Sequence, residues 1–84
     1  MIDLGGGEQS LLWVSGSDPS GHWRTEVSVN SGPWVLYQLV LPADRDVTIL
    51  GVASAPDRIQ GRVRGEAADF TPETEWAISN DLQL

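Results

Sequence analysis

Several residue types that small proteins use for support or for chemistry are missing or scarce in this chain. Its 84 residues include no cysteine, no lysine and one histidine, His22. Without cysteine the chain can form neither a disulfide nor a thiolate metal site. With one histidine, a zinc site would need mainly carboxylate ligands, which is uncommon. We therefore expect no metal and no cofactor.

Positive charge is scarce too, and long hydrophobic runs are absent. Twelve acidic residues against five arginines give a net charge of −7, with a pI near 4.2. This balance disfavours binding to nucleic acid or to anionic lipid. No apolar run approaches the roughly 20 residues that cross a bilayer, and residues 1–4 lack the basic and apolar regions of an export signal. We expect a protein made in the cytoplasm, with no nucleic-acid partner and no membrane partner.

What the chain does contain is alternation of apolar and polar residues with a period of two. In residues 23–29, Trp23, Val27 and Val29 share one face, while Arg24 and Glu26 share the other. This period is typical of a half-buried β-strand. Similar segments, separated by turn residues, cover 10–14, 34–41, 47–53 and 58–64. The pattern predicts an all-β fold, a small antiparallel β-sandwich or a partly open barrel of about six strands with meander connections.

Three local predictions refine this fold. Turn residues 30–33 predict a hairpin that makes segments 23–29 and 34–41 antiparallel neighbours. Segment 34–41 is apolar on both faces except at Gln38, which predicts a central strand covered from both sides. Near the C-terminus, Thr71 and Pro72 fit a short helix start, whereas Trp76 and Ile78 alternate with their neighbours. We favour a sixth strand there, with a short C-terminal helix as the alternative.

The length and the glycine pattern predict the domain organisation. The triplet at residues 5–7 is all glycine, which predicts a flexible joint. Residues 1–9 are therefore predicted to be a flexible N-terminal arm. Residues 10–84 suffice for one small β domain.

No motif in the chain predicts catalysis. His22 follows a loop that contains Asp18 and Ser20, but turns favour these residue types, and Ser-His-Asp triads are defined by geometry and not by short spacing. The acidic residues have no EF-hand spacing. The glycine triplet lacks the lysine of a phosphate-binding loop. We therefore predict a non-enzymatic protein with no catalytic, cofactor-binding or metal-binding residues.

Two groups of residues carry a prediction of protein binding. The arginines of segment 58–64 project from one face, while residues 66–81 hold five acids and no base. One interpretation is cross-strand pairing with acids such as Glu26. The other is a heterologous interface between copies, which closes into a ring or builds a lattice. The residues assigned to that interface are Arg58, Arg62, Arg64, Glu66, Asp69, Glu73 and Glu75.

The tryptophans suggest a further binding surface. Trp23 and Trp34 begin neighbouring predicted strands, where exposed rings would form a platform for a sugar or a protein partner. Packing in the core is the alternative for each of them. Trp13 and Trp76 are assigned to the core.

We therefore favour a structural subunit that binds copies of itself or other subunits of an assembly, such as a phage virion. Within a virion it would serve as a capsid decoration, tail or adaptor component. Two alternatives stay open. One is an acidic inhibitor that mimics the charge of nucleic acid, and the other is a carbohydrate-binding module that uses Trp23 and Trp34.

Overall fold

The structure, a computed structural model, describes residues 2–5, 9–13 and 17–84. Its regular structure consists of eight strands: β1 (Ile2–Leu4), β2 (Ser10–Trp13), β3 (His22–Val29), β4 (Val35–Val40), β5 (Asp46–Thr48), β6 (Arg58–Glu66), β7 (Ala77–Ile78) and β8 (Leu82–Gln83). None of the described residues is helical, so none of them belongs to a helix that could cross a membrane. Near the C-terminus the strand alternative holds, although β7 is only two residues long.

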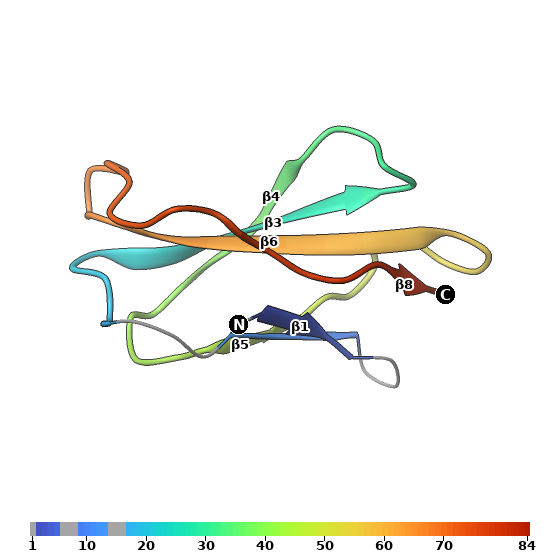
Figure 1. Ribbon diagram of the computed structural model, residues 1–84, viewed down its shortest axis with the longest axis horizontal. Coiled ribbons are helices and arrows are strands. Elements are labelled where there is room, and N and C mark those ends of the chain that lie inside the picture. The colour runs from blue at the N-terminus through green and yellow to red at the C-terminus, as the bar shows by residue number, and fades with distance from the viewer. Residues whose placement is uncertain (1, 6–8, 14–16) are drawn as a thin grey trace.

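The strands form two antiparallel sheets that face each other (Figure 1). The small sheet has the order β1-β2-β5, and the large sheet has the order β4-β3-β6-β7, with β8 also paired to β6. The fold is thus an open β-sandwich and not a closed barrel, which confirms the all-β prediction. Meander connections join β1 to β2, β3 to β4 and β6 to β7, but the predicted continuous meander is wrong, because the chain changes sheet between β2 and β3, between β4 and β5 and between β5 and β6.

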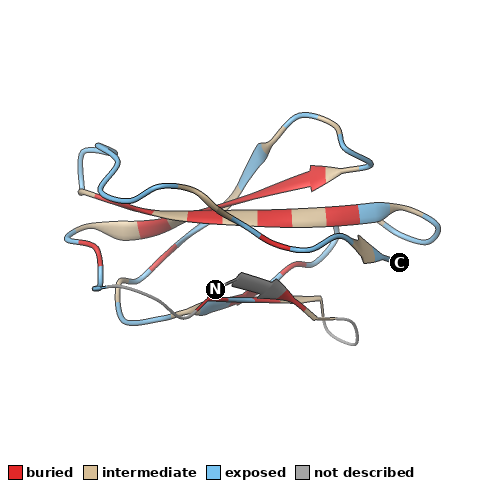
Figure 2. Cartoon of the chain, viewed as in Figure 1, coloured by how far each residue is buried: buried red, intermediate tan, exposed pale blue. Residues whose placement is uncertain are grey.

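The centre of the large sheet is the ladder between β3 and β6. It runs without interruption from His22 opposite Glu66 to Val29 opposite Ile59. Paired residues lie on the same face of a sheet, so the period-two pattern of the sequence carries over to both strands. Figure 2 shows the result along β6, where buried and half-buried residues alternate.

The core lies between the two sheets. Leu11 and Trp13 of β2 pack against Val27 of β3 and Ile59 of β6. Trp13 and Trp23 meet edge to face, with ring centroids 5.9 Å apart, a favourable arrangement for aromatic pairs. The remaining buried apolar residues are Leu4, Val40, Val47, Ile49 and Val63.

Segment 34–41 does not occupy the central position that its composition predicts. Its strand, β4, pairs with β3 on one side and has no strand partner on the other side among the described residues. Val35 is 61% exposed, and Leu36 and Leu39 are exposed as well. β6 occupies the second edge of β3. Arg62 of β6 faces Glu26 of β3, although the two residues are 36 positions apart in the chain. An apolar segment therefore ends at the rim of the sheet.

Two other predicted segments also differ from the structure. The strand predicted at 47–53 ends at Thr48, and Gly51 then adopts a left-handed backbone with φ 69°, which glycine accepts without strain. Of the predicted N-terminal arm, Ile2–Leu4 form β1, which pairs with β2. Residues 6–8 and Val14 lie outside the described residues. The flexibility of residues 1–9 stays a prediction.

Candidate functional site

The outer face of the large sheet carries alternating arginines and glutamates from β3 and β6. Arg24 lies opposite Arg64, and Glu26 lies opposite Arg62. Glu26 is buried, and its carboxylate accepts hydrogen bonds from Arg24 Nε and from Arg62 Nε, both at 2.8 Å. Each carboxylate oxygen of Glu26 therefore has an arginine partner from a strand in the middle of the sheet.

A second buried carboxylate, Glu66, ends this ladder. Its side chain is 0% exposed. His22 Nε2 donates a hydrogen bond to Oε1, and Arg64 Nε donates one to Oε2, both at 2.7 Å. The ring of Phe70 lies 5.1 Å from that of His22, centroid to centroid. The single histidine is thus engaged by a structural carboxylate.

The electrostatics of the two glutamates follow from these contacts. Burial acts to raise the pKa of Glu26, but the hydrogen bonds and charges of Arg24 and Arg62 outweigh it and lower the pKa. Burial also acts to raise the pKa of Glu66, and the hydrogen bonds from His22 and Arg64 lower it. A general acid or base works best with a pKa near the operating pH. The pKa of each carboxylate is therefore shifted further from neutral pH, as expected for structural ion pairs.

Two tryptophans enclose the arginines of this ladder. The Arg62 guanidinium carbon lies 4.6 Å from the ring centroid of Trp34 and 3.9 Å from that of Trp76. The Arg64 guanidinium carbon lies 4.4 Å from the ring centroid of Trp76. Each contact is within cation–π distance. The outer face is therefore a closed network of charge and aromatic pairs within one chain.

The predicted partner-binding residues fall into two sets. Arg62, Arg64 and Glu66 come together but pair inside the chain: Arg62 pairs across strands with Glu26, as the first interpretation predicts, whereas Arg64 pairs with Glu66 on its own strand. Arg58 Nε donates to Gln83 Oε1 at 2.9 Å, near the other end of β6.

The acids of segment 66–81 are scattered or bound locally. Hydrogen bonds from Thr71 lower the pKa of Asp69, and hydrogen bonds from Ser20 lower the pKa of Glu73. Glu75 is exposed. Because the arginines of the ladder already have carboxylate partners, the structure offers little support for an interface between their face and the acids of another copy.

The platform of Trp23 and Trp34 is not formed. Trp23 is buried against Trp13, and its Nε1 donates to the carbonyl of Pro42 at 3.0 Å. Trp34 instead lies with Arg62 on the outer face. The reason is antiparallel pairing, in which the start of one strand lies beside the end of its neighbour. Trp23 accordingly faces Val40 and not Trp34.

A different surface, which sequence reasoning missed, is exposed and apolar. It consists of the edge strand β4 with Leu41, and of the segment after β5 that faces it. We call it the β4 edge surface and define it by its exposed apolar residues, Val35, Leu36, Leu39, Leu41, Leu50 and Val52. Leu41 and Leu50 are each 70% exposed, so this surface is not part of the core of the single chain.

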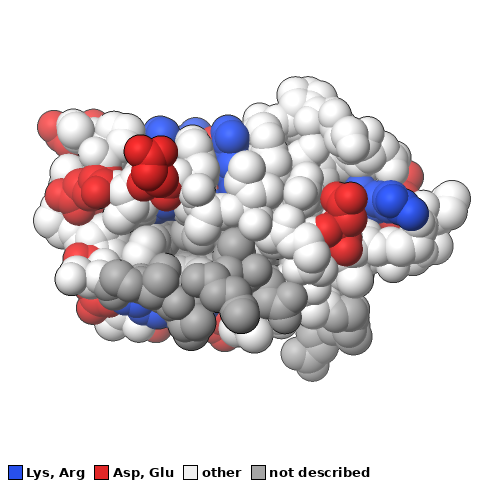
Figure 3. All heavy atoms as spheres, viewed as in Figure 1, with Lys and Arg blue, Asp and Glu red and all other residues white. Residues whose placement is uncertain are grey.

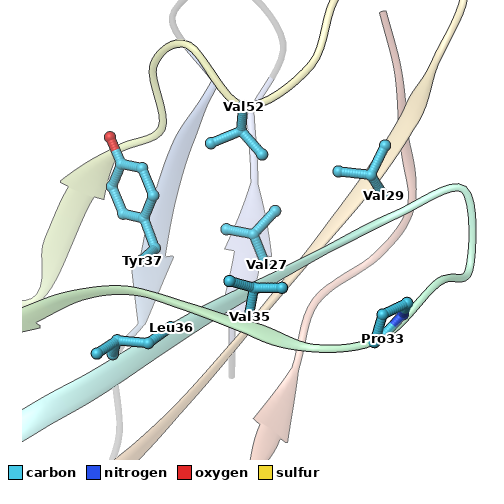
Figure 4. A pocket seen from close by; sticks show the side chains of 7 residues that line it. All are labelled: Val27, Val29, Pro33, Val35, Leu36, Tyr37 and Val52. Carbon is cyan, nitrogen blue, oxygen red and sulfur yellow. The ribbon is translucent and has the colours of Figure 1, made fainter.

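A cavity of about 360 Å³ opens within this surface (Figure 4). Val52 lies across it from Val27 and Val35, while the Tyr37 hydroxyl points away toward the chain after β5. That hydroxyl donates to Thr48 O and accepts from Leu50 N, both at 2.9 Å. The remaining lining residues are Val29, Pro33 and Leu36. The cavity wall is thus apolar, and its one hydroxyl is already bonded.

The β4 edge surface is also free of charge. The two longest stretches of the sequence without a charged residue are 27–43 and 47–56, and these stretches build it. Figure 3 shows the consequence, since the part of the molecule over the β3–β4 hairpin is white while acidic and basic atoms gather elsewhere. The signal in the sequence was this absence of charge, but an apolar run without charge is equally typical of a buried strand.

No group of three or more His, Cys, Asp or Glu side chains within the described ranges is placed to hold a metal ion. Comparison of the chain with models of protein families, with curated proteins and with solved structures finds no match.

Proposed function

We propose that the protein is a non-enzymatic subunit of a larger assembly and that it binds other protein chains through the β4 edge surface. The observation that carries this proposal is the exposure of six apolar side chains along the uncharged strand β4, at Leu41 and on the segment that faces them. Large exposed apolar patches mark interaction sites in soluble proteins. A small virion component of a phage, such as a capsid decoration, tail or adaptor protein, is the form that we favour.

The stability of so small a domain also supports an assembly role. A domain of this length buries only roughly 60 to 65% of the surface of its unfolded chain. The chain has no cysteine and so gains no stability from a disulfide. Contacts with other subunits would add to the stability that its single small core provides.

The chemistry of the surface favours a protein partner over a small molecule. The cavity has the volume of a small ligand site, but such sites orient their ligand with a few polar groups. The Tyr37 hydroxyl points away from the cavity and is bonded to backbone on two sides. A strand edge, by contrast, offers a row of backbone donors and acceptors to an added strand.

Site-specific photo-crosslinking tests this proposal. A photoreactive amino acid replaces Leu39 in one variant and Ile78 in a control variant. Both are exposed apolar residues that lie opposite an arginine, but they occupy opposite edges of the large sheet. On irradiation in the source cells, position 39 should form an adduct of discrete mass. Mass spectrometry identifies the second chain, and purified components should reproduce the adduct.

Position 78 should give no such adduct. The proposal is wrong if position 39 yields no protein adduct. It is equally wrong if both positions capture the same mixture of proteins.

A further inference from the structure

We infer that the occupant of the β4 edge surface is a second copy of this chain, which adds its own β4 antiparallel to the first across a two-fold axis. This inference rests on the proposed function and names the partner. It would join two large sheets of five strands each into one continuous sheet of ten.

The outer edge of β4 lacks the protection that edge strands usually have. Natural proteins protect edge strands with charges, with proline or with very short strands. β4 is six residues long and contains neither a charged residue nor proline. Among the described residues nothing pairs with its outer side, so alternate backbone groups there lack a strand partner. An edge of this kind is a template for another strand.

The distribution of charge also favours this edge as the contact between copies. Two copies, each with a net charge of −7, repel one another over most of their surfaces. The charged residues that bracket the β3–β4 hairpin in sequence are Glu26 and Asp44. Glu26 is neutralised by Arg24 and Arg62. β4 itself carries no charge, so two copies that pair along it bring together no like charges of that strand, and a strongly charged partner finds no opposite charge on it.

The symmetry and the size of the β4 edge surface also suit a second copy. In a two-fold contact the same patch serves both partners, and an uncharged apolar strand is complementary to itself. The exposed fractions of the six apolar residues, which lie on both faces of β4 and on the neighbouring chain, add up to an apolar area on the order of 500 Å² per copy. With the added backbone contacts this approaches the roughly 800 Å² per partner of a standard interface.

Analytical ultracentrifugation of the purified full chain tests the inference. The wild type should change from the 9.1 kDa monomer to a particle of twice that mass as its concentration rises through about 1–500 μM. L39D should raise the dissociation constant at least about tenfold, because the two-fold axis brings a pair of new charges to one interface. The matched variant I78D should change it less than about threefold.

Added salt provides an independent readout. Salt screens the repulsion between two acidic copies, so the dissociation constant of the dimer should stay the same or fall as salt is added. An interface of arginines with acids would instead dissociate in salt. Circular dichroism checks that each variant is folded. If L39D is not, L41D replaces it, because Leu41 lies outside β4 and is more exposed.

Each outcome decides the inference. The inference is overturned if the wild type stays monomeric at every concentration. It is also overturned if L39D and I78D weaken the dimer equally, or if salt dissociates the dimer. If the purified chain is monomeric but position 39 still crosslinks to a different protein in cells, the second-copy inference fails while the proposed function stands. If neither association is seen, both fail.

Discussion

Replacing Glu66 by glutamine should destabilise the domain more than any other single loss of charge. The side chain is fully buried, and both of its oxygens accept charge-assisted hydrogen bonds, from His22 and from Arg64. Glutamine keeps the shape, and its amide can accept from Arg64 and donate to His22 Nε2 when the imidazole takes the other tautomer. The substitution therefore replaces charge-assisted hydrogen bonds by neutral ones and removes the charge that neutralises Arg64.

The magnitude follows from these contacts. A hydrogen bond to a charged group contributes about 1.5–3 kcal/mol, and breaking a fully buried ion pair costs about 3–5 kcal/mol. Arg64 keeps part of its exposure and its contact with Trp76, which lowers the cost. We expect E66Q to lose about 2–4 kcal/mol at pH 7, out of a total of about 4–13 kcal/mol for a domain of this length.

The pH dependence has a definite sign. The pKa of Glu66 in the folded state is below its ordinary value of 4.5. The ionised carboxylate therefore stabilises the fold fully above that value, and its contribution is lost as the pH falls through the folded-state pKa. The difference between wild type and E66Q should shrink to less than about 1 kcal/mol once Glu66 is protonated in both states.

Denaturant unfolding monitored by tryptophan fluorescence, repeated between about pH 7 and pH 3, measures this difference. The exposed residue Glu75 provides the control, and E75Q should stay within about 0.5 kcal/mol of the wild type. A constant difference at every pH would refute the assignment of the effect to the ionised carboxylate. A loss of less than about 0.5 kcal/mol at pH 7 would refute the cost assigned to the buried pair.

Two further pairs of substitutions test the interior, one its packing and the other its indole hydrogen bonds. An alanine at Gly61 would place its Cβ 2.8 Å from Leu11 Cδ1, so G61A should lower the thermal stability by about 1–3 kcal/mol. In the control G5A the new Cβ would lie 3.8 Å from the backbone oxygen of Ser10, an ordinary contact, so its melting temperature should be close to that of the wild type. W23F loses a hydrogen bond, whereas W13F removes a buried N–H without a partner in the described part of the chain. W13F should therefore cost at least about 1 kcal/mol less than W23F in denaturant unfolding, and the reverse order would contradict this reasoning.

Part of the candidate site could be read from the sequence, because spacing along one strand places side chains on one face. The shared face of Arg62 and Arg64 follows from their separation by two residues. Arg64 also has a local partner, since Glu66 is two residues away on the same strand. The pairing of Arg62 with Glu26 and of His22 with Glu66 could not be read from the sequence, because each joins β3 to β6. His22 and Glu66 are separated by 44 residues.

The sequence by itself determined the class of fold and the orientation of side chains within each strand. Alternation of period two is a property of the extended backbone, so residues 23–29 and 58–64 already show which side chains face inward. The hairpin from β3 to β4 was also readable, because its turn is local. These features need no knowledge of distant contacts.

Only the tertiary structure decided which strands lie in the middle of the large sheet. A run such as Val35–Val40 satisfies the pattern of a covered central strand, yet β6 occupies the second edge of β3 and leaves β4 at the rim. The physical reason is that each strand has two edges, and the pairing that fills them depends on register with residues far along the chain. That choice turned an apolar segment into an exposed surface.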